Sequence, residues 1–452
     1  KIRIEDFSLD EIWNNKNINN KEFKNLNSFN WFFSLDLKSS KKTVQSIISR
    51  WIMNNKKYND KSWNFDLTAK RIISWLSNHH LTYDESDQNF KNSFNTIIKK
   101  QANHLINEIN KSKIIDDKLI GCASIILVGL CYHDNKKYLA FGTLLLKKIT
   151  KFTLDNSGFP KSRNIKQLTF YLKYFVLIRE WFKEAQVEIP EQINETIYYL
   201  GQGYAFLWQN IQFDILMNGN NISNNSSFDN YLKRFGYKFK NENNEFGGYA
   251  ILQNKKICLI IDSGSSPEFK FTKDYQSGTL SFEIISNGKK LISNCGYSKR
   301  NIELNRLSKS TAAHSTLIID DNSSCKLTKI EGSWMTKKSI KVIKKNIIFE
   351  KDYWKANFSH DGYLKKYNSI HERLIEFYPQ EMKFIGLDKI IKKKTNNNYK
   401  FDIRFHLTPN VKLMKTQDNK SILIELDDEG WKFTCDNYDI NIDNGLYFGN
   451  KN

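Results

Sequence analysis

The apolar residues of this chain repeat with two different periods, and the change of period limits what the chain can fold into. In the first half they recur at helical spacing, as in Val44, Ile47, Ile48, Trp51 and Ile52, and in Phe94, Ile97, Ile98, Leu105, Ile106 and Ile109. Such spacing is typical of helices with one face against a core. Further helices are expected over residues 68–78, 119–131, 139–152, 166–182 and 193–207. Consecutive helices with short connections pack antiparallel, which favours helical hairpins curled into an incomplete toroid.

Beyond a polar stretch at residues 218–244 the pattern becomes that of short strands. Residues 280–286 and 290–293 alternate on either side of Asn287-Gly288. This dipeptide is a strong hairpin signal, because both turn positions favour a positive φ. The sequence therefore predicts a multidomain α and β protein with an N-terminal incomplete α/α toroid (1–217), a linker (218–246) and a C-terminal antiparallel β-sandwich (247–452).

Length and composition agree with a folded protein of two domains or more. The chain has 452 residues, of which 40% are hydrophobic and 14% aromatic, enough to form substantial cores. Its longest apolar run, residues 123–132, is about half of the ~20 residues that cross a bilayer, so no membrane span is expected. The chain begins at Lys1 without an evident leader, and the residues alone leave the compartment undecided.

The formal charge of +20 favours acidic partners, such as uronic-acid polysaccharide, nucleic acid or anionic lipid. Arg supplies 10 of the 69 basic residues, so 69 − 10 = 59 are Lys, and a compositional origin of the charge stays open beside a selected polyanion surface. Phosphate recognition commonly uses forked guanidinium contacts, which this chain has few residues to supply. We therefore expect no nucleic-acid partner.

The six cysteines form no CxxC pair, and no histidines cluster beside them to complete a zinc knuckle. We interpret most of them as small buried apolar residues. A disulfide is possible in an oxidising compartment, but the spacing indicates no pairing.

Two segments between Tyr275 and Asp321, YQSGTLSFEIISNGKKLISNCG and KSTAAHSTLIIDD, carry a family resemblance. They resemble the HxHAD-like segment, the D/N-[SC]-G turn and the TAAH[NS]T segment of the C-terminal β-domain of heparinase II/III-type polysaccharide lyases. Other segments look like family motifs in the same order: SWNFDLTAKRIISWL from Ser62, SGFPKSRN from Ser157, HDGY and HERL within 360–374, RFHLTPNV from Arg404 and GWKF from Gly430. The match looks closest to the divergent alphaproteobacterial branch. The resemblance implies an α/α toroid, a polysaccharide substrate and a place in the periplasm or cell envelope.

Cleavage of a uronate by β-elimination needs a group that neutralises the carboxylate, a base for the C5 proton and an acid for the leaving oxygen. By resemblance, the toroid Asn and Tyr of active relatives fall on Asp117 and Gln167, and the first β-domain His falls on Asp274. The three zinc positions fall on Gln276, Asn294 and His314. One imidazole with two neutral amides is a poor zinc site, so we predict no metal cofactor. We expect a hydrogen-bond network of the two amides, completed by His314, in its place.

Candidate residues follow from these positions and from the SRN loop. We predict His314, Tyr275 and Asp274 as catalytic and Arg163, Asn164, Lys161, Gln276 and Asn294 as substrate-binding, in a cleft between toroid and sandwich. Alternatives stay open for several of them. Tyr275 is as compatible with a core as with a site, because it should point opposite to its neighbours on an alternating strand. His314 could be structural, Lys161 could be solvated, and Tyr171, Tyr174, His360, His371 and Arg373 are expected to be mostly structural.

Two functions are compatible with this sequence. The first is a lyase that cleaves an acidic polysaccharide by β-elimination with a remodelled catalytic set. The second is a glycan-binding or envelope protein that kept the scaffold and lost the chemistry, since a fold alone does not decide function.

Overall fold

The computed structural model describes residues 19–35, 39–134, 136–222, 225–337, 339–392, 398–409 and 411–449. Its contacts divide the chain into two compact units. The first unit runs up to Phe152 and includes Lys173–Ile197; the second contains Thr153–Leu172 and the chain from Tyr198 onward. The predicted domain limits at residues 217 and 247 stay predictions.

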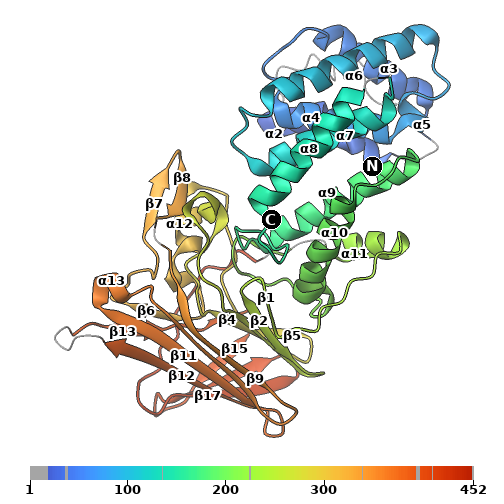
Figure 1. Ribbon diagram of the computed structural model, residues 1–452. Helices are drawn as coiled ribbons and strands as arrows, with labels where there is room; N and C mark the ends of the chain where they lie inside the picture. Colours follow the sequence, from blue (N-terminus) through green and yellow to red (C-terminus); the bar gives the residue numbers. More distant parts are fainter. Residues whose placement is uncertain are drawn as a thin grey trace. The chain divides into compact units, whose positions relative to one another are not determined.

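Helices follow one another through the N-terminal half (Figure 1). They are α2 (Asn20–Ser28), η2 (Asn30–Ser34), α3 (Lys41–Asn55), α4 (Phe65–Ser77), α5 (His79–Thr82), α6 (Gln88–Glu108), α7 (Ile115–Cys131), α8 (Lys136–Thr153), α9 (Ile165–Glu184), α10 (Glu191–Tyr204), the π-helical η3 (Ala205–Gln209) and α11 (Asn225–Arg234). The fold class is confirmed: the helical region is an incomplete α/α toroid followed by antiparallel sheets. The predicted linker is partly helical, because α11 lies within it.

The core of the first unit explains the motif that starts at Ser62. Trp51 and Trp75 pack edge to face at 5.5 Å, and the guanidinium of Arg71 lies 4.0 Å from the centre of the Trp51 ring. Arg71 is fully buried and donates to the Asn27 and Ser62 carbonyls, both at 3.0 Å. Burial lowers the pKa of Arg71 to about 9. These residues therefore hold the helices together.

The second half is built from antiparallel strands. They are β1 (Glu245–Phe246), β2 (Tyr249–Gln253), β3 (Ile257–Asp262), β4 (Phe282–Ser286), β5 (Lys289–Ser293), β6 (Leu317–Ile319), β7 (Leu327–Ile330), β8 (Ser333–Thr336), β9 (Val342–Phe349), β10 (Trp354–His360), β11 (Ser369–Tyr378), β12 (Lys383–Lys392), β13 (Phe401–Ile403), β14 (His406–Leu407), β15 (Lys412–Lys415), β16 (Ser421–Leu426) and β17 (Glu429–Thr434). Short helical segments η4 (Phe269–Asp274), α12 (Ile302–Lys309), η5 (Thr311–Ala313) and α13 (Leu364–Tyr367) connect some of them.

Three sheets share one core. The strand orders are β1-β2-β3-β4-β5-β14, β12-β11-β10-β9 and β15-β16-β17. Buried side chains from all three pack together, including Leu259, Phe358 and Ile424. The predicted hairpin is confirmed, since Asn287 and Gly288 have φ of 41° and 77° between β4 and β5. Among the described residues, no helix is long and apolar enough to cross a membrane.

The HERL segment forms a buried polar network on the β10-β11-β12 sheet. Arg373 on β11 faces Asp388 on β12 and donates to both of its carboxylate oxygens, at 2.8 and 2.9 Å. His371 Nε2 lies 2.6 Å from Asp388, and its Nδ1 lies 3.2 Å from Nε2 of His360. Burial disfavours a charged carboxylate, but Arg373 and His371 hold the pKa of Asp388 below its usual value. These side chains are structural.

Candidate functional site

Asp274, the last residue of η4, is a predicted site residue that is partly open to solvent. Its Oδ1 accepts a hydrogen bond from Tyr297 Oη at 2.8 Å. Its Oδ2 accepts from Lys299 Nζ at 3.1 Å and from Asn164 Nδ2 at 3.3 Å. We call these four residues the Asp274 cluster, and all of them belong to the second unit.

The Asp274 cluster is charged and partly open to solvent. The Asp274 side chain is 23% exposed and that of Lys299 is 64% exposed. Burial alone would raise the pKa of the Asp274 carboxyl, but Lys299, Tyr297 and Lys309 together hold it below its usual value. Burial and the Asp274 charge raise the pKa of Tyr297 well above the ordinary value. The cluster thus combines an ionised carboxylate, a protonated phenol, an amide and an exposed ammonium.

Asn164 reaches Asp274 because it also begins α9. Its Oδ1 accepts from the N–H groups of Lys166 and Gln167, at 2.9 and 3.2 Å, as a helix N-cap does. Its amide nitrogen is then left for Asp274. Gly219, with φ of +83°, lies against both, since an added Cβ would come within 2.8 Å of Asn164 Nδ2 and 2.9 Å of Asp274 Cβ. A side chain at position 219 would therefore disturb the cluster.

Arg163 has different surroundings from those predicted for a substrate contact. A guanidinium has five N–H donors, and here each is used within the second unit. The acceptors are the carbonyls of Gly247, Gly248, Gly264 and Ser265 and a carboxylate oxygen of Asp262 at 2.6 Å. Burial opposes the charge, but Asp262 keeps the pKa of Arg163 above its ordinary value. The predicted substrate-binding role of Arg163 is therefore not favoured, because no donor is left for a ligand.

Lys161 lies two residues before Arg163 and is half-buried. Its backbone N–H donates to the Thr153 carbonyl at 2.8 Å. Its substrate-binding role stays a prediction.

Tyr275 does not lie on a strand, which corrects the expected alternation of residues 274–276. The 3-10 helix η4 ends at Asp274, and β4 begins only at Phe282. Tyr275 is 1% exposed, packs with Cys325 and Ile340, and its hydroxyl lies 3.0 Å from Thr279 Oγ1. Burial raises its pKa well above the ordinary value. Of the two alternatives, core and site, these surroundings favour the core.

Gln276 and Asn294 form the expected amide contacts, but chiefly with the backbone. Gln276 Nε2 donates to the carbonyls of Gly296 and Ser308, and its Oε1 accepts from Gly219 N–H at 3.0 Å. Asn294 Oδ1 accepts from Ser315 N–H at 2.9 Å, and its Nδ2 donates to the buried Glu283 at 3.2 Å. Both side chains are fully buried. They bind segments of the fold together, and neither is exposed to a ligand.

His314 does not complete this network. It is 1% exposed, and neither ring nitrogen has a hydrogen-bond partner of ordinary geometry among the described residues. Burial and, to a lesser extent, His406 lower its pKa to about 3, against an opposing effect of the Ser308 carbonyl. The ring lies against the Cα of Gly278, where an added Cβ would come within 2.9 Å of His314 Cγ. His314 is thus a neutral, enclosed imidazole.

The described residues bring together no group of three His, Cys, Asp or Glu side chains that could hold a metal ion. At the positions that correspond to the zinc ligands of relatives, the amides of Gln276 and Asn294 are occupied by backbone and Glu283 contacts. These residues do not fit a zinc ion, which prefers imidazole, thiolate and carboxylate ligands. We derive no chemical step through a metal.

Asp117 and Gln167, the two positions that correspond by resemblance to the toroid Asn and Tyr of active relatives, lie in different units. Gln167 accepts a hydrogen bond from Ser162 Oγ at 2.6 Å. Burial and the nearby Asp117 raise the pKa of Tyr174 to about 12. Asp117 therefore disfavours ionisation of the neighbouring Tyr174.

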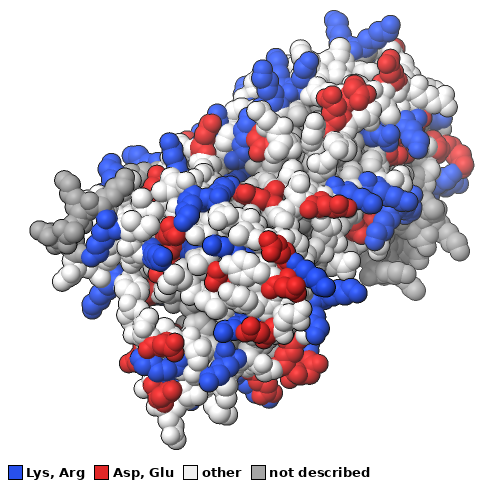
Figure 2. Space-filling model, turned by 60° about the horizontal axis from the view of Figure 1, so that its bottom comes forward, with Lys and Arg blue, Asp and Glu red and all other residues white. Residues whose placement is uncertain are grey.

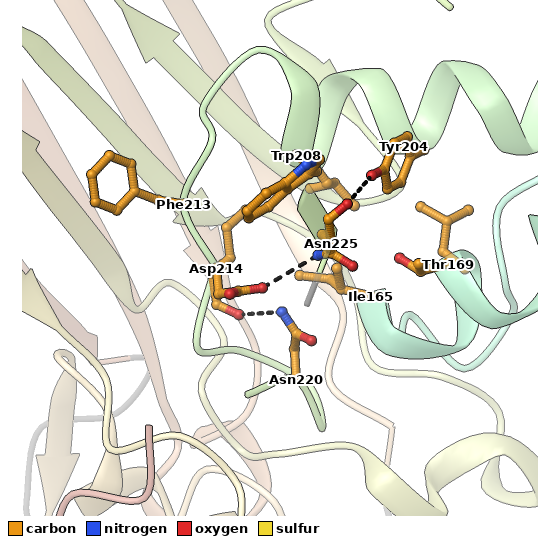
Figure 3. Close-up of a pocket in the computed structure, with 11 residues that line it drawn as sticks. Ile165, Thr169, Tyr204, Trp208, Phe213, Asp214, Asn220 and Asn225 are labelled. Carbon is orange, nitrogen blue, oxygen red and sulfur yellow. Dashed lines mark hydrogen bonds between the residues drawn. The ribbon is translucent and has the colours of Figure 1, made fainter. Parts of the chain in front are cut away.

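The cavities of the two units differ in size. An enclosed cavity in the second unit is lined by Tyr204, Asp214 and Asn225 among others, joined by hydrogen bonds of 3.2 and 3.3 Å (Figure 3). It has room for about one water molecule, which is too small for a sugar ring. A more open groove of about 460 Å³ in the first unit is lined by lysines, amides, a serine and an aspartate, including Lys21, Lys24 and Asn25.

On the face that Figure 2 shows, the surface charge does not gather in a single field. Figure 2 shows Lys and Arg side chains scattered over the face in view, with Asp and Glu among them. This distribution agrees with the compositional alternative for the net charge. Recognition of an acidic ligand would then depend on local groups such as Lys299.

Tyr297, Lys299 and Lys309 were not among the predicted site residues. The first two follow the CG turn in the sequence CGYSKR, and Lys309 begins KSTAAH. A signal was present in the chain, because an Asp in place of a His near the core calls for a neighbouring cation or donor. Which residue supplies it depends on tertiary packing.

Comparisons with known proteins agree with this architecture. A family model described as "Heparinase II/III-like, C-terminal" matches residues 243–452. The crystal structure of heparinase III aligns with a TM-score of 0.67 at 15% identity, over 94% of this chain and 70% of that chain. A heparan sulfate lyase HepC mutant from Pedobacter heparinus aligns with a TM-score of 0.69 at 14% identity, over 92% of this chain and 69% of that chain. At these identities the likeness to solved structures concerns the fold.

The chain is also similar to part of a much longer protein. Protein Ycf2 of Physcomitrium patens is 27% identical over 403 residues, which are 80% of this chain and 17% of Ycf2. The chain thus spans a small part of that protein. The family model thus matches residues 243–452, somewhat less than half of the chain, and the solved structures share the toroid-plus-sandwich fold.

Proposed function

We propose that this protein binds an acidic, uronate-containing polysaccharide at the Asp274 cluster and cleaves it by β-elimination. The observation that carries the proposal is the 2.8 Å hydrogen bond between Tyr297 and Asp274 beside the exposed ammonium of Lys299. The lyase-like scaffold supports the reaction class. Such a substrate favours the periplasm or cell envelope, and the proposal includes no metal cofactor.

The cluster contains a group for each step of the reaction. The ammonium of Lys299 would pair with the uronate carboxylate and stabilise the charge that develops there. The Asp274 carboxylate would accept the C5 proton, and the electron pair of that C–H bond would form the C4–C5 double bond as the C4–O bond breaks. Tyr297 Oη would give its proton to the leaving glycosidic oxygen. Asp274 would then return the C5 proton to Tyr297 along their hydrogen bond, which restores both groups.

The second function, glycan binding without cleavage, is favoured by a specific observation. The pKa of Asp274 is lowered and that of Tyr297 is raised, and both shifts move these groups away from values suited to proton transfer near neutral pH. The lysine-lined groove of the first unit offers a further polar surface without a paired acid and base.

Incubation of the purified protein with a panel of uronic-acid polysaccharides tests the proposal, with the ultraviolet absorbance of the unsaturated product as the readout. Tyr297→Phe removes only the hydroxyl, and we expect it to lower the rate on the order of a hundredfold or more. Tyr353→Phe is the matched control, because Tyr353 also donates to a carboxylate, that of Glu376 on β11, away from the Asp274 cluster. Its rate should equal that of the wild type.

The outcomes separate the two functions. Product formation that survives Tyr297→Phe would show that another group is the acid. Binding by calorimetry without product on any polysaccharide would establish the second function, and absence of both binding and product would refute the Asp274 cluster as a glycan site.

A further inference from the structure

Lys309, the last residue of α12, has a fully buried side chain. Its Nζ donates to the carbonyl of Lys273 and to the carbonyl of Trp334 on β8. The same ammonium lies 5.8 Å from the centre of the Tyr297 ring, within the range of a cation–π contact. Three separate parts of the second unit therefore meet at one charge.

Two of these contacts touch the Asp274 cluster directly. The Lys273 carbonyl belongs to the peptide group that precedes Asp274, and Tyr297 is the hydrogen-bond partner of Asp274. The backbone of Lys309 holds the other side of the same segment, because its carbonyl accepts from Ser277 N–H at 2.9 Å. Lys309 thus forms hydrogen bonds at both ends of residues 273–277 and lies beside the ring of Tyr297.

Burial of a lysine ammonium in this space has a large desolvation cost. Its hydrogen bonds are to neutral carbonyls, and burial lowers its pKa to about 8 although Asp274 opposes the shift. A methionine of similar length would avoid the desolvation of an ammonium. The charge therefore calls for a role that a hydrocarbon side chain would not provide.

We propose that Lys309 is a positioning residue that fixes Asp274 and Tyr297 relative to each other. The inference rests on the proposed function for the choice of those two groups as the reacting pair. The restraint itself is a property of the chain and can be measured without any glycan.

Hydrogen exchange monitored by mass spectrometry measures this restraint. In Lys309→Met we expect exchange to become several-fold faster in peptides that cover residues 269–277 and 333–336. Peptides that cover β16 and β17 should exchange as in the wild type, because this change should loosen one region and leave the rest of the fold intact. Lys309→Gln, which keeps a donor, serves as a milder second variant if Lys309→Met does not fold.

Lys255→Met is the matched control. Lys255 is exposed in the turn between β2 and β3, so this variant removes the same charge without touching the restraint. Its exchange pattern should equal that of the wild type. Unchanged exchange at 269–277 in both Lys309 variants, or an equal increase in every peptide, would overturn the proposal.

Activity gives the second readout. We expect Lys309→Met to lower turnover of the cleaved polysaccharide on the order of tenfold to a hundredfold, as small displacements of reacting groups do, with KM changed less. If local exchange rises as expected but the wild type neither binds nor cleaves any polysaccharide, the restraint stands and the proposed function falls. If the wild type cleaves and both Lys309 variants cleave equally well, the function stands and the role of Lys309 falls.

Discussion

Asp274 and Asp388 are both carboxylates whose pKa is lowered. Each lies beside a cation and a second hydrogen-bonding side chain, yet their surroundings differ. Asp388 is 7% exposed, and its cation, Arg373, is 3% exposed. Asp274 is 23% exposed, and its cation, Lys299, is 64% exposed. The exposure of the cation therefore decides whether a ligand can compete with the carboxylate for that cation. A sealed pair contributes to the fold, whereas an open pair can exchange partners.

The secondary structure explains this difference. Asp388 and Arg373 are direct cross-strand neighbours, and Arg373 lies on the same face of β11 as the core residues Ile375 and Phe377. Asp274 ends a short 3-10 helix outside the sheets, and Tyr297 and Lys299 follow β5 in an irregular segment. The sheet fixes one carboxylate, and connecting segments carry the other, as is common for functional groups.

Removal of each carboxylate should show the difference between the two sites most clearly. Asp388→Ala leaves Arg373 buried without its partner, and we expect a loss of about 3–5 kcal/mol in the free energy of unfolding. Asp274→Ala should cost about 1 kcal/mol or less, because Lys299 is solvated without it. Chemical denaturation of both variants checks this.

Asp402→Ala is a further control for the sealed carboxylate. Asp402 is 59% exposed and lies 3.6 Å from Arg404, so its loss should cost less than about 0.5 kcal/mol. Equal costs for Asp388→Ala and Asp274→Ala would show that the two carboxylates do not differ as described.

Acid should destabilise the second unit, because four of its histidines are held neutral. Burial lowers the pKa of His314, His360, His371 and His406 below the ordinary value of 6.5. As the pH falls through about 6.5, the unfolded chain takes up protons that the folded chain refuses, so stability falls. Each group contributes up to about 1.4 kcal/mol per pH unit, and we expect a total loss on the order of 3 kcal/mol between about pH 6.5 and 5.5.

Denaturant titrations at a series of pH values measure this loss. A His133→Asn variant should give the same curve as the wild type, because His133 is an exposed residue of the first unit. A stability that stays constant from neutral pH to about pH 5 would contradict the neutral state of the four histidines.

Gly278→Ala tests how tightly His314 is enclosed. The added Cβ would meet the imidazole at 2.9 Å, so the ring or the backbone must shift. We expect a loss of about 1–3 kcal/mol in the free energy of unfolding, the usual cost of overpacking a core. Gly386→Ala, where an added Cβ meets nothing within 4 Å, is the matched control and should be neutral or slightly stabilising. Equal stability of the two variants would mean that the space around His314 is not filled.

Lys299→Met should have the smallest effect on stability and a clear effect on binding. An exposed ion pair contributes less than about 1 kcal/mol, so the unfolding transition should hardly move. Affinity for an acidic polysaccharide should fall roughly tenfold, which corresponds to about 1.4 kcal/mol. Lys344→Met, which breaks the 3.0 Å pair between β9 and Glu372 on β11, should leave affinity unchanged. Similar affinities for the two variants would place the glycan elsewhere.

Much of the fold could be predicted from the sequence, because hydrophobic period alone identifies long elements. The helix expected over residues 119–131 is α7 (Ile115–Cys131), and the Asn287-Gly288 hairpin lies where its signal indicates. The region around residues 274–276 could not be predicted in the same way. It is too short to show a period, and its 3-10 turn places Tyr275 and Gln276 both in the interior.

The candidate site was less predictable, since its contacts join residues far apart in sequence. Arg163 was expected to present its guanidinium to a substrate, but its partners include backbone carbonyls of glycines, whose acceptors no sequence pattern marks. Tyr297 and Lys299 meet Asp274 across more than 20 residues of chain. Asn164 was identified in the SRN loop, although its cap role and its contact with Asp274 became visible only in the structure.

The contacts of Arg163 have a consequence for the order in which the protein is made. The partners of Arg163 lie between Gly247 and Ser265, at least 84 residues later in the chain. A ribosome adds Arg163 well before it reaches these partners. The guanidinium therefore lacks them until β2 and β3 emerge. A fragment that starts at residue 243, where the family match begins, would contain Asp262 but never receive Arg163. The region that the family model matches thus lacks a side chain on which its own packing depends.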